Sequence, residues 1–226
     1  MKQKIETSAL ATQIHRVLRE EIISGLHSPG DKLDINKLAE KFGVSRSPVK
    51  EAVNQLVHEG LIEILPRKGT YITQLKYQDL IELLEVRFMA ETWAARIVCS
   101  TITEEELNKW KQILIKMDDL IGEQSFSFDA YSKLDVEFHQ LLVAWTSNKK
   151  VLDIYQSINP KVLLARVIYS NVFENSLKRH KDHHYMYEAL KNRNLSKLIN
   201  AIEQHKESIK KDIALQWNEQ LHGPMK

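Results

Sequence analysis

The 226-residue sequence has one cysteine and few glycines and prolines, and these shortages narrow the class of protein. Cys99 has no partner for an internal disulfide, and its apolar neighbours are typical of a buried helical thiol. No apolar run is long enough to span a bilayer, and the N-terminus lacks the apolar core of a signal peptide. These absences argue against a disulfide-stabilised secreted domain and predict a cytoplasmic protein with no membrane partner.

An excess of charge of one sign is also missing, since the sequence has 32 Lys and Arg residues and 30 Asp and Glu residues. Overall charge therefore gives no sign of nucleic-acid binding, and only local clusters of basic residues can. Most glycines and prolines lie before residue 70, so short, interrupted elements come first and long, uninterrupted ones follow. This division predicts two domains, residues 1–75 and residues 76–220.

The stretch from Gly43 to Leu56 has the pattern of a DNA-recognition helix. Its apolar residues recur with the period of one buried helix stripe, at Val49, Ala52, Val53, Leu56 and Val57. Basic and polar residues occupy the other face, and such a helix fits the DNA major groove. The alternative is an ordinary surface helix with solvated charges.

The neighbours of this stretch favour the DNA-binding interpretation. Ser8 is expected to cap a first helix and Asp34 a second, which ends at Gly43 just before the recognition helix. Two helices joined by a short turn with glycine are typical of a helix-turn-helix. Residues 61–65 and 70–73 predict a hairpin with a basic tip, a wing that can reach phosphates or the minor groove.

These segments resemble the winged helix of the GntR family of bacterial transcription regulators. The resemblance covers residues 10–74 and is carried by residues 29–33, 38–40, 43–52, 59–62 and 66–70. It implies a DNA-facing set made of Ser45, Arg46, Ser47 and Lys50 on the helix and Arg67, Lys68 and Gly69 on the wing. Lys50 stands where the family usually has Arg, so a phosphate contact is kept but the fork that reads guanine is lost.

The rest of the chain predicts an all-α bundle. Six helices are expected, at residues 78–99, 103–121, 127–146, 150–171, 176–192 and 195–217. Thr103 and Glu106 have the spacing of a capping box, and the apolar period of Val151, Ile154, Tyr155 and Ile158 supports the fourth helix. The predicted fold class is therefore mainly α, with an N-terminal winged helix-turn-helix followed by a helical bundle.

Four side chains in this bundle have the chemistry of a metal site. Asp135 and His139 are four residues apart, so they project from one helix face. His183 and His205 each lie roughly 15 Å along their helices from the turn between them, so an antiparallel hairpin brings them level. Three imidazoles and one carboxylate suit zinc, or another divalent transition metal such as nickel or manganese, with open coordination positions.

Two neighbouring histidines compete with one member of this set. His180 and His184 are alternatives to His183, which is favoured by its spacing to His205 and by the inward stripe of its helix. Each signal is weak alone, because a lone histidine is more often a surface residue or a satisfied core residue than a metal ligand.

Residues 78–217 resemble the ligand-binding domain of the FadR branch of the GntR family, the FCD domain in its metal-containing form. The resemblance is carried by residues 85–87, 134–139, 147–148, 182–190 and 205. It implies that the aspartate and the three histidines hold a divalent metal whose open positions face a small carboxylate effector. Arg87 and Arg166 interrupt apolar helix patterns and are candidates to bind that anion; a solvated helix edge is the alternative for both.

Together these features predict a homodimeric transcription regulator, expected to be a repressor, that senses a small organic acid through a bound metal. One recognition helix reads only a few base pairs, so a two-fold dimer on a palindromic double-stranded DNA operator is expected. One alternative is a metal-dependent hydrolase, for which the sequence supplies no clear general base. The other is a regulator whose metal is purely structural.

Overall fold

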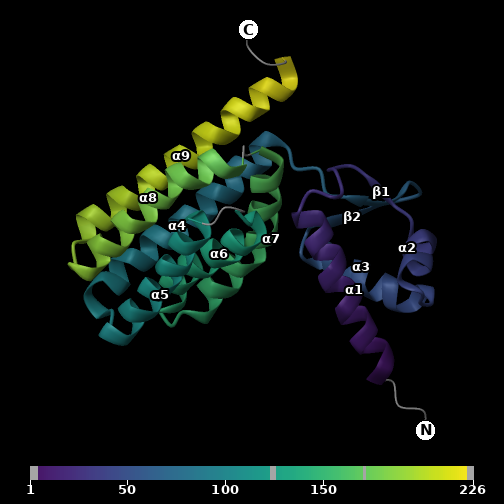
Figure 1. The fold of residues 1–226 in the computed structure, drawn as a ribbon, viewed down its shortest axis with the longest axis horizontal. Coiled ribbons are helices and arrows are strands. Elements are labelled where there is room, and N and C mark those ends of the chain that lie inside the picture. Colours follow the sequence, from purple (N-terminus) through teal and green to yellow (C-terminus); the bar gives the residue numbers. More distant parts are fainter. Residues whose placement is uncertain (1–4, 123–125, 170–171, 223–226) are drawn as a thin grey trace. The chain divides into compact units, whose positions relative to one another are not determined.

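A computed structural model of the chain describes residues 5–122, 126–169 and 172–222, with two compact units, Met1–Lys76 and Tyr77–Lys226. The first unit combines helices with a small sheet, and the second is helical (Figure 1). The predicted fold class, mainly α with an N-terminal winged helix-turn-helix, is confirmed. None of the helices in the described ranges is long and apolar enough to cross a membrane.

The N-terminal unit is a winged helix-turn-helix. Its helices are α1 (Ile5–Ile23), α2 (Ile35–Phe42) and α3 (Arg46–His58), and its strands are β1 (Lys32–Leu33), β2 (Ile62–Leu65) and β3 (Gly69–Ile72). The strands form an antiparallel sheet in the order β1-β3-β2, and β2 pairs with β3 as the predicted wing hairpin. The two-residue strand β1 was not predicted; it adds to the free edge of β3, where Lys32 pairs with Tyr71.

Local chemistry fixes the turn before α3. The carboxylate of Asp34 accepts hydrogen bonds from the backbone N–H groups of Asn36 and Lys37, which begins α2 as predicted. Gly43 ends α2 in the left-handed conformation, with φ +64°, and α3 begins three residues later. The expected cap at Ser8 is wrong, because α1 already includes residues before it.

The C-terminal unit is a bundle of long helices. They are α4 (Tyr77–Thr101), α5 (Glu104–Gly122), α6 (Phe128–Ala144), α7 (Lys149–Tyr169), α8 (Val172–Lys191) and α9 (Leu195–His222). In Figure 1, α9 runs alongside α8, and it also packs against α4. The predicted capping box is present: the backbone N–H of Thr103 donates to Glu106, and the N–H of Glu106 donates to the Thr103 hydroxyl.

A buried tryptophan ties α5 to α6 next to the predicted metal site. The Trp110 ring is fully buried and stacks on Phe138 with 4.2 Å between ring centroids. Its Nε1 also donates a hydrogen bond of 2.7 Å to the carbonyl oxygen of Phe138. Because Phe138 precedes His139, these contacts fix the position of α6 where it presents that imidazole.

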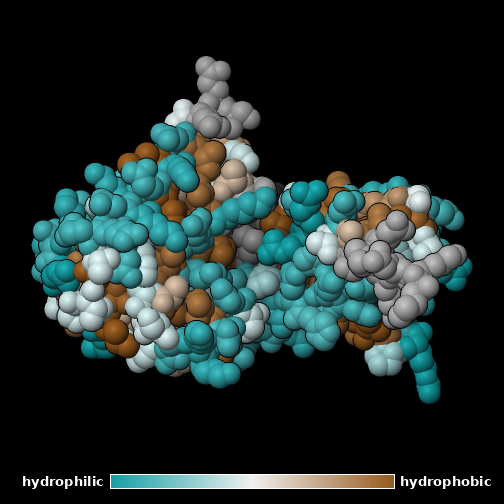
Figure 2. All heavy atoms as spheres, turned by 90° about the horizontal axis from the view of Figure 1, so that it is seen from below, coloured by the Kyte–Doolittle hydropathy of each residue, from teal (hydrophilic) through white to brown (hydrophobic). Residues whose placement is uncertain are grey.

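One residue of the apolar stripe of α7 lies at the surface. Ile154 is 57% exposed, whereas the adjacent Tyr155 is 1% exposed and faces the bundle interior. The bundle therefore covers only part of this stripe, and Val151 and Ile158 are half-buried. Figure 2 shows that hydrophobic patches lie between hydrophilic ones on the surface of the helical unit.

Candidate metal centre

The four predicted ligands, Asp135, His139, His183 and His205, meet inside the helical unit. They come from α6, α8 and α9, each is at most 3% exposed, and one ligand atom of each lies within 4.8 Å of the others. The Nε2 atom of His183 lies 3.0 Å from Nε2 of His139 and 3.3 Å from Oδ1 of Asp135. The structure therefore gathers the whole predicted set into one cluster.

The α8–α9 hairpin brings the last two histidines level, as their distances from the turn predicted. The Asn194 side chain accepts a hydrogen bond of 3.0 Å from the backbone N–H of Lys197, which caps α9 at the turn. Beyond this turn the two helices run antiparallel, and the ring centroids of His183 and His205 are 4.8 Å apart. On α6, the four-residue spacing places Asp135 and His139 on the same face.

Carboxylates orient two of the imidazoles from outside the cluster. Nδ1 of His139 lies 3.3 Å from Oε2 of Glu91, and Nδ1 of His205 lies 3.2 Å from Oδ2 of Asp182. A carboxylate behind a histidine fixes its tautomer and directs the other nitrogen to the metal in many metal sites. The prediction from the sequence missed both carboxylates in this role.

A buried charge network lies beside the cluster. Arg87 is 2% exposed and Glu91 is fully buried; the arginine Nε donates to Oε1 of Glu91 at 2.7 Å. The Tyr155 hydroxyl donates to the same oxygen at 2.5 Å, and Nη2 of Arg87 lies 4.0 Å from Oδ2 of Asp135. Burial opposes ionisation of Glu91, but the charges of His139 and Arg87 outweigh it and hold its pKa below the ordinary value.

The donor set fits a divalent transition metal. Imidazole and carboxylate ligands about 2.1 Å from an ion are about 3.0–3.4 Å from one another, as the 3.0 and 3.3 Å separations here are. Burial lowers the pKa of His183 well below its ordinary value, which favours the neutral form that binds metals. Among the described residues, Nδ1 of His183 and Nη2 of Arg87 have no hydrogen-bond partner.

The two predicted effector-binding arginines differ in what the structure describes. Arg87 lies against the cluster, inside the bundle, so the alternative of a solvated helix edge is excluded for it. Arg166 lies on α7, but its side chain is outside the described residues.

The predicted DNA-facing residues form two exposed groups in the N-terminal unit. The helix group is exposed at the start of α3 and comprises Ser45, Arg46, Ser47 and Lys50. The opposite face of α3 is buried through four members of the predicted stripe, and the fifth, Val57, is half-buried; the buried four are Val49, Ala52, Val53 and Leu56. The wing group lies at the β2–β3 turn, where Arg67 and Lys68 are exposed and Gly69 is half-buried.

The wing turn depends on unusual backbone angles. Arg67 has φ +63° and Gly69 has φ +125°, and a Cβ atom at Gly69 would come within 3.0 Å of the Lys32 side chain. A glycine therefore suits the close approach of the turn to β1, and the turn holds Arg67 and Lys68 outward.

Comparison with known families matches both units. Residues 10–72 match the family described as bacterial regulatory proteins, gntR family, and residues 82–208 match the FCD domain. The HTH-type transcriptional repressor RspR of Escherichia coli K12 is 29% identical over 212 residues, which cover 92% of this chain and 90% of RspR. The gluconate operon transcriptional repressor of Bacillus licheniformis is 29% identical over 206 residues, covering 88% of this chain and 83% of the relative.

A solved structure shares the fold at low sequence identity. E. coli McbR/YncC superposes with a TM-score of 0.76 and 16% identity, over 92% of this chain and 99% of that one. This likeness shows a common architecture and carries no information on ligands.

Proposed function

Because this chain belongs to the GntR family of bacterial transcription regulators and is a DNA-binding regulator with an FCD domain, we propose that the FCD domain is a metal-dependent sensor. The buried cluster holds one divalent transition metal, most suitably zinc, with nickel and manganese as alternatives. A small carboxylate effector completes the coordination of that metal. Repression is the proposed sign of regulation, since the relatives RspR and the gluconate operon regulator are named repressors.

The gathering of four ligand side chains beside a buried arginine carries this proposal. A carboxylate bound to the metal would lie next to Arg87, whose Nη2 lacks a hydrogen-bond partner among the described residues. A planar guanidinium is suited to a carboxylate, because it offers parallel N–H donors as well as charge. Arg166 is the second proposed effector contact.

A homodimer is the proposed working form, because a palindromic operator is read by two recognition helices. An apolar groove between α4 and α7 supports a contact between two copies in the FCD domain. Its rim includes Val86, Met89 and Ile154, which are 36%, 67% and 57% exposed. Packing such residues against a second copy would remove apolar surface from water. The effector acts by binding dimer states with different affinity, which changes the spacing of the recognition helices.

A carboxylate screen tests the sensor. We expect at least one small organic acid to raise the melting temperature of the metal-loaded protein, because a ligand stabilises the state that binds it. The same acid is expected to leave the chelated protein and Asp135→Asn unchanged. A purely structural metal would give no acid-dependent shift in the loaded protein, and turnover of an ester or amide panel would favour the hydrolase alternative.

Arg46→Ala is expected to weaken operator binding by more than about 1 kcal/mol, because Arg46 is exposed at the DNA-facing start of α3. Fluorescence anisotropy on a duplex selected by the wild-type protein from a randomised pool measures the loss. Arg96→Ala, which removes an exposed arginine from α4, is the matched control and should bind normally. Equal affinities for Arg46→Ala and the control would refute the assignment of Arg46.

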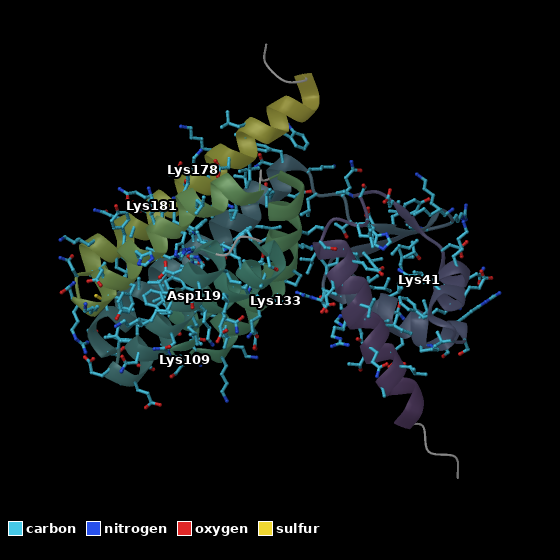
Figure 3. All side chains as sticks on the ribbon, viewed as in Figure 1. Lys41, Lys109, Asp119, Lys133, Lys178 and Lys181 are labelled. Carbon is cyan, nitrogen blue, oxygen red and sulfur yellow. The ribbon has the colours of Figure 1, made fainter. Side chains whose placement is uncertain are left out.

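Lys68→Ala is expected to reduce the salt dependence of DNA binding and to weaken all sequences alike. A lysine that contacts one phosphate contributes about one to the slope of log affinity against log salt concentration. Titrations at several salt concentrations measure the slope, with the exposed Lys109→Ala, labelled on α5 in Figure 3, as control. An unaltered slope in Lys68→Ala would show that the wing does not contact phosphate through this residue.

A further inference from the structure

A second group of ligating side chains lies outside the buried cluster. Asp118 on α5 meets His180 and His184 on α8. The Nε2 atoms of the two histidines lie 2.6 and 2.9 Å from the same oxygen, Oδ1 of Asp118. All three ligand atoms lie within 4.8 Å of one another, as in the buried cluster.

Helix geometry separates this group from the buried cluster. His180 and His184 are four residues apart and so share one face of α8, the face that packs against α5. Their ring centroids are 4.9 Å apart, close to the 5.0 Å between His139 and His183 in the buried cluster. His183 lies 5.9 Å from His180, centroid to centroid, and turns into the bundle instead.

We propose that Asp118, His180 and His184 form a second site for a divalent transition metal, open to solvent. Two imidazole nitrogens and a carboxylate oxygen are the ligands that zinc, nickel and cobalt take in proteins, and three protein ligands leave positions for water. The Asp118 and His184 side chains are 44% and 46% exposed, whereas that of His180 is 8% exposed. Metal can therefore enter and leave this site directly, so it binds more weakly and exchanges faster than the buried centre.

Without metal, hydrogen bonds hold the three side chains of this group together, with both imidazoles turned to the same oxygen of Asp118. Nε2 of each imidazole is therefore the atom that a metal would take, and the separations of 2.6 and 2.9 Å from Oδ1 would widen to about 3.0–3.4 Å when the ion enters. Nδ1 of His180 lies 3.5 Å from the Tyr131 hydroxyl, and when that hydroxyl oxygen accepts the Nδ1 proton, Nε2 is left free to bind a metal.

A metal bound at the second site would also affect the buried centre. A metal held by Asp118 and the α8 histidines would fix α5 to α8 one residue away from the buried ligand His183. The concentration of free metal would thus influence α8, the helix that carries the buried ligand His183.

Titration of Zn²⁺ into the full-length protein, with the buried centre already loaded, tests the second site. We expect one further equivalent of Zn²⁺ to bind. Isothermal titration calorimetry and competition with a chromophoric chelator measure this binding. Asp118→Asn and His184→Gln should each lower the affinity for this further Zn²⁺ ion by at least about tenfold, because the loss of even an outer hydrogen-bond partner of a ligand lowers metal affinity that much. His58→Gln, which removes an exposed imidazole from α3, is the matched control and should keep it.

Two results would overturn the second site. One is saturation of the wild-type protein with no binding beyond the buried centre; the other is retention of the weaker equivalent by both Asp118→Asn and His184→Gln. Both variants change exposed side chains, so their melting curves should match wild type without metal. A His183→Ala, His205→Ala variant keeps this test independent of the proposed sensor, because it should lose only the tighter equivalent.

Discussion

The protein purified without chelator and then dialysed is expected to retain about one divalent metal ion per chain, and His183→Ala, His205→Ala none. The double variant keeps one carboxylate and one imidazole, too few ligands to hold a transition metal through dialysis. The exposed site of Asp118, His180 and His184 should empty under the same conditions, so the retained metal reports on the buried centre alone.

Mass spectrometry of the dialysed protein gives the metal content, and His58→Ala is the matched control, which should keep the ion. Since His183 and His205 are fully buried, circular dichroism must first show that the double variant is helical. Asp135→Asn, which preserves shape and removes the anionic ligand, provides a second variant and should weaken retention. A wild-type protein free of metal, or a double variant that keeps it, would refute the buried centre.

Local spacing explains what the sequence predicted well. The recognition helix, the wing hairpin and the capping box each depend on residues within a few positions of one another, and all are present. The buried His/Asp cluster could also be predicted from the sequence, because a four-residue spacing fixes one pair of side chains and equal distances from a turn fix the other. The expected cap at Ser8 failed because the first helix begins before it, and the exposure of Ile154 shows that neighbouring helices decide which part of an apolar stripe is covered.

Tertiary packing explains what the sequence did not reveal. In the sequence Glu91 resembles any glutamate on a helix, and only the approach of α6 and α7 shows it to be buried between His139 and Tyr155. Its one local signal is the four-residue spacing from Arg87 within an apolar pattern. Similarly, Asp118 joins His180 across 62 positions, a pairing that no periodicity contains.

Arg87→Met is expected to destabilise the metal-free protein by about 3–5 kcal/mol, the usual cost of removing one partner of a buried ion pair. Methionine fills much of the volume, but it leaves the fully buried carboxylate of Glu91 without its 2.7 Å donor. Adding Glu91→Gln to Arg87→Met should recover a large part of the loss, because the buried side chain at position 91 then carries no charge that needs the arginine. Arg96→Met on the exposed face of α4 should stay within about 0.5 kcal/mol of wild type.

Urea unfolding of the four proteins measures these differences, and an Arg87→Met variant as stable as Arg96→Met would show that the buried pair does not support the fold. Arg87→Lys then separates stability from sensing. Lysine keeps the positive charge near Glu91 and Asp135 but loses the planar donors suited to a carboxylate, including Nη2. We expect Arg87→Lys to bind the operator normally and to lose the response to the acid found in the screen; a normal dose–response would remove Arg87 from the effector site.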